Sequence, residues 1–363
     1  MRAAIFRNRD FVVDTLPDPT PGAGQVLVKT VCCGICGTDL HTARFTDQFV
    51  ERSKKTAGRW TMDPSRDLVF GHEFCCEVME HGPGTDKKLK PGTLVVSMPL
   101  TLDGNVVQGL GYNNDIPGGF AQYMPLAERM LLAVPNGLPA DEAALTEPIA
   151  VGWHAVQSAR MGTDDVPLVV GCGPVGLSVI AALKVKGVRP IIAADYSPGR
   201  RALALAMGAD IVVDPAQHSP YETWTQHGTP PGFDPSRYAQ LFGLGPKLRP
   251  AVIFECVGVP GVIQQIIDGA PAGARIVVVG VCMETDRIEP FFGILKQVNI
   301  QFVLAYTVAE FAESLHLIAE GKVDVSPLIT GTVGLDGVKG AFADLANPET
   351  HAKILVDPWR ETT

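Results

Sequence analysis

The chain has 363 residues, a length that predicts two domains. Hydrophobic residues make up 46% of it and charged residues 19%, which excludes an intrinsically disordered protein. The formal net charge of −9 argues against a nucleic-acid partner, and no apolar run approaches the roughly 20 residues that span a bilayer. The eight cysteines have no regular spacing, so we expect free or metal-binding thiols in a cytoplasmic protein without a membrane partner.

Residues 1–152 are predicted to form a β-rich first domain. Short apolar runs at 26–31 and 93–97 follow the pairs Pro21-Gly22 and Pro91-Gly92, which is typical of strands separated by turns.

From residue 153 to residue 297, predicted strands alternate with predicted helices. The strands are expected at 168–170, 191–194, 211–213, 251–254 and 275–279, and the first two helices at 174–186 and 199–207. This alternation predicts right-handed βαβ units and therefore a parallel sheet. Residues 298–363 end in an apolar run at 353–356 that is expected to return to the first domain and complete it.

A glycine-rich run follows the first strand of the predicted parallel sheet. Gly171, Gly173 and Gly176 have the G-x-G-x-x-G spacing and enclose Cys172, Pro174 and Val175. Such a run permits a tight turn, brings a pyrophosphate close to the backbone and opens a helix whose first N–H groups face the phosphates. A glycine-rich turn without a ligand is the alternative.

An acidic residue in the expected place strengthens the dinucleotide interpretation. Asp195 closes the second strand, near the spacing of about 20 residues expected for the carboxylate that accepts the ribose hydroxyl groups. A carboxylate would repel a 2′-phosphate, so we expect NAD in preference to NADP. Arg200, followed by Arg201, weakens this preference because a guanidinium could approach a phosphate.

Candidate metal ligands are scattered through the first domain. Cys36, His72, Glu73 and Glu147 offer a thiolate, an imidazole and carboxylates, the ligands that zinc prefers in catalytic sites. Cys33 and Cys36 also form a C-x-x-C pair, so a redox pair or half of a structural zinc site remains open. Cys32, Cys33, Cys75 and Cys76 are predicted to be small core residues.

These motifs together resemble the zinc-dependent medium-chain alcohol/polyol dehydrogenases, in particular the sorbitol and butanediol dehydrogenase branch. The resemblance runs through essentially the whole chain and rests on residues 33–41, 71–73, 147–151, 171–176 and 255–258. It implies an α/β protein with a GroES-like β-rich catalytic domain and a Rossmann domain, a doubly wound parallel sheet.

The resemblance also implies the zinc ligands. Cys36 and His72 match the cysteine and histidine ligands of the family, and Glu147 matches a position that holds glutamate in the sorbitol and butanediol branch. Glu73 matches a glutamate that binds the metal directly in some members and lies behind the direct ligands, without binding the metal, in others. We expect Cys36 and His72 to be ligands, with Glu73 and Glu147 as alternative third ligands.

Two departures from the family pattern change the expectation. The stretch from Ser97 to Phe120 contains no cysteine, whereas many members carry four there, so one catalytic zinc and no structural zinc is expected. The connection from Thr42 to Phe70 is longer than in relatives. Its Phe45, Phe49 and Trp60 could cover the substrate, or the segment could be a surface insertion.

The remaining site residues are predicted from the chemistry together with the resemblance. Thr38 and His41 would pass a proton from the substrate to solvent, and Cys36, His72 and Glu147 would hold the zinc beside the substrate. Peptide groups near Val257 and from Val279 to Val281 resemble those that hold the nicotinamide carboxamide in the family.

The expected reaction is hydride transfer between NAD and a secondary alcohol, diol or polyol. Two alternatives remain: a carbonyl reductase of the same fold, and a non-catalytic protein that binds NAD and zinc as a redox sensor. The family resemblance implies a homodimer or a homotetramer.

Overall fold

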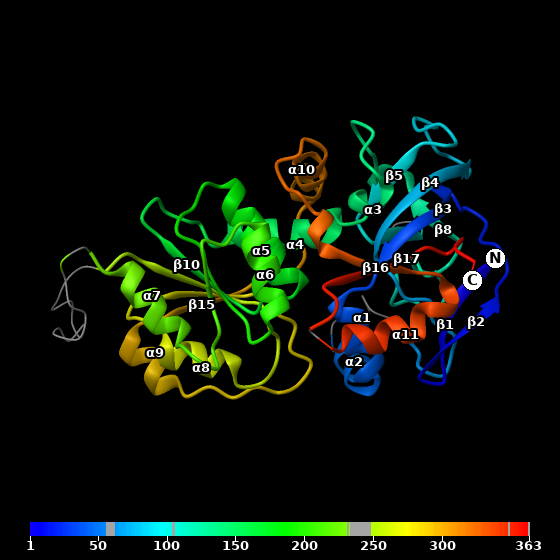
Figure 1. Cartoon of the computed structure of the whole chain (residues 1–363). Coiled ribbons are helices and arrows are strands. Elements are labelled where there is room, and N and C mark those ends of the chain that lie inside the picture. Colours follow the sequence, from blue (N-terminus) through cyan, green and yellow to red (C-terminus); the bar gives the residue numbers. More distant parts are fainter. Residues whose placement is uncertain (56–61, 104–105, 231, 233–247, 348, 362–363) are drawn as a thin grey trace. The chain divides into compact units, whose positions relative to one another are not determined.

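The computed structural model describes residues 1–55, 62–103, 106–230, 232, 248–347 and 349–361. The chain forms two compact units, one made of Met1–Glu147 with Phe311–Thr363 and the other of Pro148–Glu310 (Figure 1).

The first unit is rich in strands and contains both ends of the chain. From the N-terminal part come β1 (Arg2–Arg7), β2 (Asp10–Thr15), β3 (Gln25–Gly34), α1 (Gly37–Arg44), α2 (Thr46–Ser53), β4 (Glu73–His81), β5 (Leu94–Ser97), β6 (Leu100–Asp103), β7 (Val106–Gly109), β8 (Tyr123–Ala127), β9 (Leu131–Ala133) and α3 (Ala140–Ala143). From the C-terminal part come β16 (Ile329–Val333), α11 (Val338–Leu345) and β17 (Lys353–Val356).

Strand β3 lies at the centre of the seven-stranded sheet of this unit. The sheet has the order β16-β17-β3-β4-β5-β9, and β8 also pairs with β3. Along β3, Val26, Val28 and Thr30 are buried while the residues between them are half-buried, as the two-residue period of a strand requires. Strand β17 pairs antiparallel with the end of β3. Residues 353–356, expected to return to the first domain, thus form a strand of the sheet of the first unit.

The second unit contains a six-stranded, fully parallel sheet of order β12-β11-β10-β13-β14-β15. Its elements are β10 (Val166–Val170), α5 (Pro174–Val185), β11 (Ile192–Ala194), α6 (Pro198–Met207), β12 (Ile211–Val213), α7 (Pro220–Gly228), β13 (Ala251–Glu255), α8 (Val262–Gly269), β14 (Arg275–Val278), α9 (Pro290–Lys296) and β15 (Asn299–Phe302). The strand order reverses between β10 and β13, which makes this a doubly wound Rossmann sheet with its ligand-binding switch point there.

The helices that pack on this parallel sheet contact one another in pairs. Helices α5 and α6 pack against each other, α5 on β10 and β13 and α6 on β11 and β12, while α8 packs on β13 beside α9 (Figure 1). The five strands and two helices predicted for this region are all present, and the α/β fold class is confirmed.

The division between the units differs from the predicted boundaries at 152/153 and 297/298. Helix α4 (Thr146–Ser158) runs through the first division and α10 (Val308–Ala319) through the second. Strand β15 lies after residue 298 but pairs with β14, so the return to the first unit begins about one strand later than predicted. Pro148 is the first residue of the second unit, yet it lies in the first turn of α4, where a proline does not end a helix.

None of the helices within the described residues is both long enough and apolar enough to cross a membrane.

Candidate metal and dinucleotide sites

Cys36 lies between the end of β3 and the start of α1. It is the N-cap residue of α1, in an extended backbone conformation, and its backbone N–H donates to Asp39 Oδ2 at 3.0 Å. A carboxylate three residues after an N-cap is the reciprocal half of a capping box. The helix start therefore fixes the Cys36 thiol and the Asp39 carboxylate relative to each other.

His72 directly precedes β4 and is buried. Its Nδ1 lies 3.2 Å from Asp39 Oδ1 and 3.3 Å from the hydroxyl oxygen of Tyr112, which donates to Asp39 Oδ1 at 3.0 Å. Because Nδ1 is held by these groups, Nε2 is the ring nitrogen left for a metal, the arrangement typical of histidine ligands backed by a carboxylate.

The electrostatic field at His72 favours positive charge. Burial alone would lower the pKa of His72, but the negative charges of Asp39 and Cys36 raise this pKa well above its usual value. A divalent cation experiences the same field as the imidazolium proton, so these surroundings suit a metal ion.

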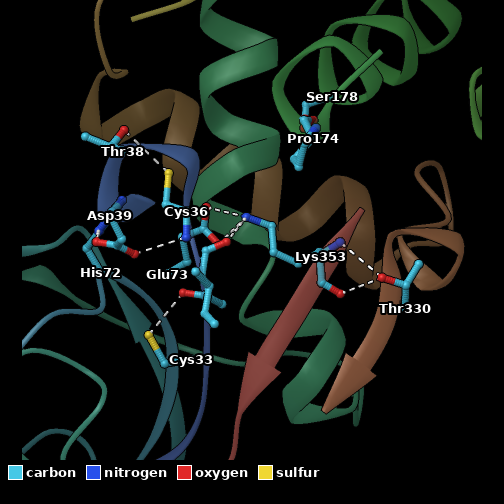
Figure 2. Close-up of polar contacts among 12 residues, drawn as sticks. Cys33, Cys36, Thr38, Asp39, His72, Glu73, Pro174, Ser178, Thr330 and Lys353 are labelled. Carbon is cyan, nitrogen blue, oxygen red and sulfur yellow. Dashed lines mark hydrogen bonds and ion pairs between the residues drawn. The ribbon is translucent and has the colours of Figure 1, made fainter. Parts of the chain in front are cut away.

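Glu73, the first residue of β4, forms a buried ion pair with Lys353, the first residue of β17. Lys353 Nζ lies 2.7 Å from Oε1 and 2.6 Å from Oε2 and also donates to the Ile35 carbonyl at 3.0 Å (Figure 2). Glu73 leans over β3 at Gly34, where a Cβ would collide with Glu73 Oε2. Only glycine at this position leaves room for the carboxylate.

Cys36, His72 and Glu73 bring one possible ligand atom each within 4.8 Å of one another. Within the described residues no other set of three such side chains comes this close. Sulfur, imidazole nitrogen and carboxylate oxygen are the donors that zinc accepts, so these residues fit a zinc ion.

Glu147 lies outside this set. It occupies the first turn of α4 and is 9% exposed. Burial and the charge of Asp39 raise the pKa of Tyr112. Burial alone would lower the pKa of Lys353, but the surrounding negative charges, above all that of Glu73, raise this pKa. Glu147 adds a smaller contribution to both shifts, so it lies in the electrostatic surroundings of the cluster.

The predicted proton-transfer residues both lie on α1. Thr38 Oγ1 is 3.6 Å from Cys36 Sγ (Figure 2). His41 follows three residues later, half-buried, with its ring 6.4 Å from the ring of Phe45. Residues three apart share a helix face.

The other cysteines do not join the cluster. All eight cysteines are free, and Cys32, Cys33, Cys75 and Cys76 are buried in the core of the first unit, as predicted. Cys33 Sγ lies 3.6 Å from the Gly34 carbonyl oxygen rather than beside Cys36 (Figure 2). The C-x-x-C pair is therefore not a disulfide here, and only Cys36 is placed to bind a metal.

The glycine run forms the turn between β10 and α5. Gly171 has φ +91°, a conformation that favours glycine, and a Cβ at Gly176 would collide with the Gly171 carbonyl. Gly173 is the N-cap of α5 and Pro174 its first residue, so the first helical N–H groups open onto this turn. Gly173, Pro174 and Val175 are half-exposed and accessible to a ligand.

Asp195 follows β11, beside this turn. Its Oδ2 accepts the Cys172 N–H at 2.7 Å and its Oδ1 accepts the Ser197 N–H at 2.8 Å. Each carboxylate oxygen keeps a second lone pair for a ligand hydroxyl. Arg200 Nη1 would lie 3.9 Å from a Cβ at Gly173, and its buried Nε has no hydrogen-bond partner in the described residues.

The predicted carboxamide-binding peptides lie at the carboxyl ends of β13 and β14. Val257 and Val281 are 39% and 42% exposed, whereas Val279 is buried.

Two family models match the chain. The model for the alcohol dehydrogenase GroES-like domain matches residues 22–136, and the model for zinc-binding dehydrogenases matches residues 174–320. The (R,R)-butanediol dehydrogenase of Bacillus subtilis (strain 168) is 31% identical over 371 residues, covering 99% of this chain and 100% of the relative. The chain belongs to the zinc-dependent medium-chain alcohol/polyol dehydrogenases.

Further relatives agree with this assignment. The (R,R)-butanediol dehydrogenase of Neisseria gonorrhoeae is 29% identical over 377 residues, covering 99% of each chain. The crystal structure of 2R,3R-butanediol dehydrogenase from Bacillus subtilis superposes with a TM-score of 0.78 at 28% identity, covering 98% of this chain and 99% of that chain. The predicted family, the predicted two-part fold and the oxidoreductase class are confirmed.

Three residues that contact the cluster of Cys36, His72 and Glu73 were not predicted: Asp39, Tyr112 and Lys353. Asp39 had a local signal, because a carboxylate three residues after an N-cap faces the cap. Lys353 had a weaker signal, since a charged residue at the start of an otherwise apolar strand needs a buried partner. Tyr112 had none, because its contact depends on a loop that lies 40 residues from His72 in sequence.

The predicted long loop from Thr42 to Phe70 is partly helical. Helices α1 and α2 occupy residues 37–53, and Phe49 packs against the core with its ring 5.5 Å from that of Tyr112. Phe45 caps α2, while Trp60 lies outside the described residues.

Proposed function

We propose that this protein catalyses reversible hydride transfer between NAD and a secondary alcohol, diol or polyol, with one zinc ion bound at Cys36 and His72. One observation carries the proposal. A thiol, an imidazole and a carboxylate converge within 4.8 Å in a chain whose second unit has a dinucleotide turn. The butanediol dehydrogenases named above favour a small diol as the first substrate to test.

The third zinc ligand is proposed to be Glu147, with Glu73 as the alternative that can replace it. Both oxygens of Glu73 are paired with Lys353, which offsets the charge of this carboxylate. Two uncompensated carboxylates beside a thiolate would give the zinc shell a net negative charge and weaken its ability to polarise a substrate. A bound zinc supplies the Lewis acid that lowers the pKa of the alcohol.

Thr38 and His41 are proposed to conduct the alcohol proton away. The Thr38 hydroxyl next to Cys36 accepts the substrate proton as it releases its own, and the His41 imidazole takes up that proton and passes it to water. Asp39 and Tyr112 keep His72 in the tautomer whose Nε2 is unprotonated.

NAD is proposed as the cofactor in preference to NADP. Its pyrophosphate would bind at Gly171, Gly173 and the N-terminus of α5, and Asp195 would accept the ribose hydroxyl groups. Arg200 would add positive charge beside the turn. The nicotinamide carboxamide would bind the peptides near Val257, Val279 and Val281.

A homodimer is proposed on the basis of one exposed edge, and a homotetramer would need a second interface in addition. Strand β15 is the last strand of the six-stranded sheet, and the apolar side chains near it are unusually exposed: Phe291, Ile294, Phe302 and Leu304 at 67%, 76%, 71% and 79%. An exposed apolar edge strand of this kind is normally paired with another strand or shielded from solvent. A two-fold axis would pair β15 with β15 of a second subunit in antiparallel orientation. The eight free thiols are in keeping with a cytoplasmic location.

The test is a screen of alcohols, diols and polyols with NAD and with NADP, together with metal analysis. We expect about one zinc per chain, NADH formation with secondary alcohols or diols, and loss of that activity on chelation with recovery on adding zinc. Zinc-independent activity would contradict the zinc mechanism. NADH binding without turnover on any substrate in either direction would favour the sensor function.

A further inference from the structure

Glu255 is a buried carboxylate that neither the metal cluster nor the dinucleotide turn uses. It is the last residue of β13 and is 1% exposed. A carboxylate that is removed from water costs free energy unless hydrogen bonds replace its hydration. The partners of Glu255 therefore indicate what it does.

All of these partners are backbone groups of two loops. Glu255 Oε1 accepts the N–H groups of Val257 and Gly258 at 2.7 and 2.8 Å, in the loop after β13. The Glu255 backbone carbonyl accepts the N–H groups of Val279 and Gly280, both at 2.9 Å, in the loop after β14. A single residue thus binds both loops through four N–H groups.

The two loops approach each other so closely that only glycine fits. Gly258 has φ +70°, and a Cβ there would lie 2.8 Å from the Val281 backbone N. A Cβ at Gly280 would lie 2.8 Å from Glu255 Oε2 and would collide with the Gly258 backbone N. The carboxylate therefore lies within a backbone-to-backbone contact rather than in a cavity.

The hydrogen bonds to Glu255 also determine which backbone N–H groups of the two loops are free to bind a ligand. The N–H groups of Val257, Gly258, Val279 and Gly280 point to Glu255, so they cannot donate to a ligand at the same time. Val257 and Val281 nevertheless present exposed apolar side chains on these loops. This edge of a doubly wound sheet, at the carboxyl ends of strands beside the reversal of strand order, is where ligands bind.

We propose that Glu255 is a positioning residue for the nicotinamide end of the dinucleotide. It holds the loops after β13 and β14 in register, so that their exposed backbone and the side chains of Val257 and Val281 form one binding surface. Glu255 itself does not touch the cofactor. The proposal rests on the NAD-dependent function proposed above.

The position of the adenine half makes a selective test possible. Asp195 and the glycine turn lie at the ends of β11 and β10, and the hydrogen bonds of Asp195 go to Cys172 and Ser197 rather than to Glu255. ADP-ribose carries the whole adenine half and the pyrophosphate but has no nicotinamide. A ligand pair of NADH and ADP-ribose therefore separates the effect on the nicotinamide surface from an effect on the whole unit.

The experiment measures dissociation constants of both ligands by calorimetry for the full-length wild type and three variants. Glu255→Leu removes the acceptor, Glu255→Gln keeps one acceptor oxygen, and Phe254→Leu, on the same strand and fully buried, changes packing without removing a hydrogen bond. In Glu255→Leu we expect NADH binding to weaken about tenfold more than ADP-ribose binding, since hydrogen bonds to a charged group are lost. Glu255→Gln should lie between this variant and the wild type, and Phe254→Leu should affect both ligands equally.

Equal weakening of NADH and ADP-ribose in Glu255→Leu and Glu255→Gln, or no change in either, would overturn the positioning role. If Glu255→Leu does not fold, the comparison rests on Glu255→Gln, for which a selective loss of NADH affinity supports the proposal and a uniform loss or no loss contradicts it. A wild type that binds neither ligand would instead refute the NAD-dependent function.

Discussion

Lys353 and Glu73 form an ion pair in which each side chain is only 1% exposed, with Nζ within 2.7 Å of both carboxylate oxygens. Thr330 on β16 holds the backbone of Lys353 on both sides, because its Oγ1 donates to the Lys353 carbonyl and accepts from the Lys353 N–H (Figure 2). The ammonium is thus fixed beside the cluster of Cys36, His72 and Glu73.

Removing this ammonium should destabilise the protein in a zinc-dependent manner. Lys353→Met leaves Glu73 as an unpaired buried charge, a change that typically costs about 3–5 kcal/mol in the free energy of unfolding. Adding zinc should raise the free energy of unfolding more for the variant than for the wild type. The reason is that the Glu73 carboxylate, no longer paired with Lys353, lies beside Cys36 and His72. Urea unfolding with and without zinc measures both quantities.

The matched control for this variant is Lys339→Met. Lys339 pairs with Asp10 on the surface, where the two side chains are 64% and 53% exposed, so its loss should change the free energy of unfolding far less than the loss of Lys353. An identical loss for Lys353→Met in the presence and absence of zinc would show that Glu73 has no part in metal binding.

Replacing the proposed sulfur ligand should separate metal binding from cofactor binding. Cys36→Ser should lose zinc and lower turnover more than about 100-fold, beyond the range typical of residues that only support a ligand. The dissociation constant of NADH should stay near the wild-type value, because the dinucleotide turn belongs to the second unit. Zinc content, turnover and NADH titration report these three effects, with Cys33→Ala as the control that should retain zinc.

The hydroxyl group of Tyr112 should increase the affinity for zinc. Tyr112→Phe keeps the ring that packs near Phe49 and His72 but removes the hydroxyl group from Asp39. We expect zinc affinity to fall about 10- to 100-fold, as for other groups that orient a histidine ligand. Competition with a zinc chelator measures the affinity. Tyr123→Phe, whose ring packs on Trp359, is the control and should leave the affinity unchanged.

Asp195 should determine the preference between the two nicotinamide cofactors. Asp195→Ala should weaken NAD binding roughly 10- to 100-fold, since a charged acceptor is lost, and NADP binding much less, since the repulsion of the 2′-phosphate is lost as well. The ratio of kcat/KM for NAD and NADP checks this. Asp210→Asn changes a carboxylate at the opposite end of the strands, where it accepts the Ile191 N–H, and should leave the ratio as it is.

The exposed edge at β15 should control the oligomeric state. Phe302→Asp places a charge on the edge strand and should yield monomers at concentrations where the wild type sediments as a dimer, or dimers where the wild type sediments as a tetramer. Val107→Asp, at another exposed apolar position, serves as the control. Unchanged sedimentation of the Phe302 variant would place the subunit interface elsewhere.

Local patterns in the sequence predicted the second unit well. The strands from β10 to β14 and the glycine turn depend on short apolar runs and on residues within about ten positions of each other, so periodicity and spacing suffice. Cys36 and His72 could be singled out because few residue types bind zinc. Their convergence with Glu73 became visible only in the structure.

The rest depends on contacts between distant segments. Lys353 reaches Glu73 across 280 residues, and Tyr112 reaches Asp39 across 73. No spacing rule covers such distances. The division between the units falls inside α4 and α10, where the helical pattern continues without interruption.

The first unit is assembled from residues 1–147 and 311–363, with the second unit between them. During translation the ribosome therefore releases the entire Rossmann unit before the strand at 353–356 exists, although domains otherwise tend to fold in the order in which they are made. A nascent chain that lacks this strand also lacks the Lys353 ammonium that offsets the charge of Glu73. The segment that carries Lys353 therefore completes the surroundings of Glu73 only after the second unit has been made.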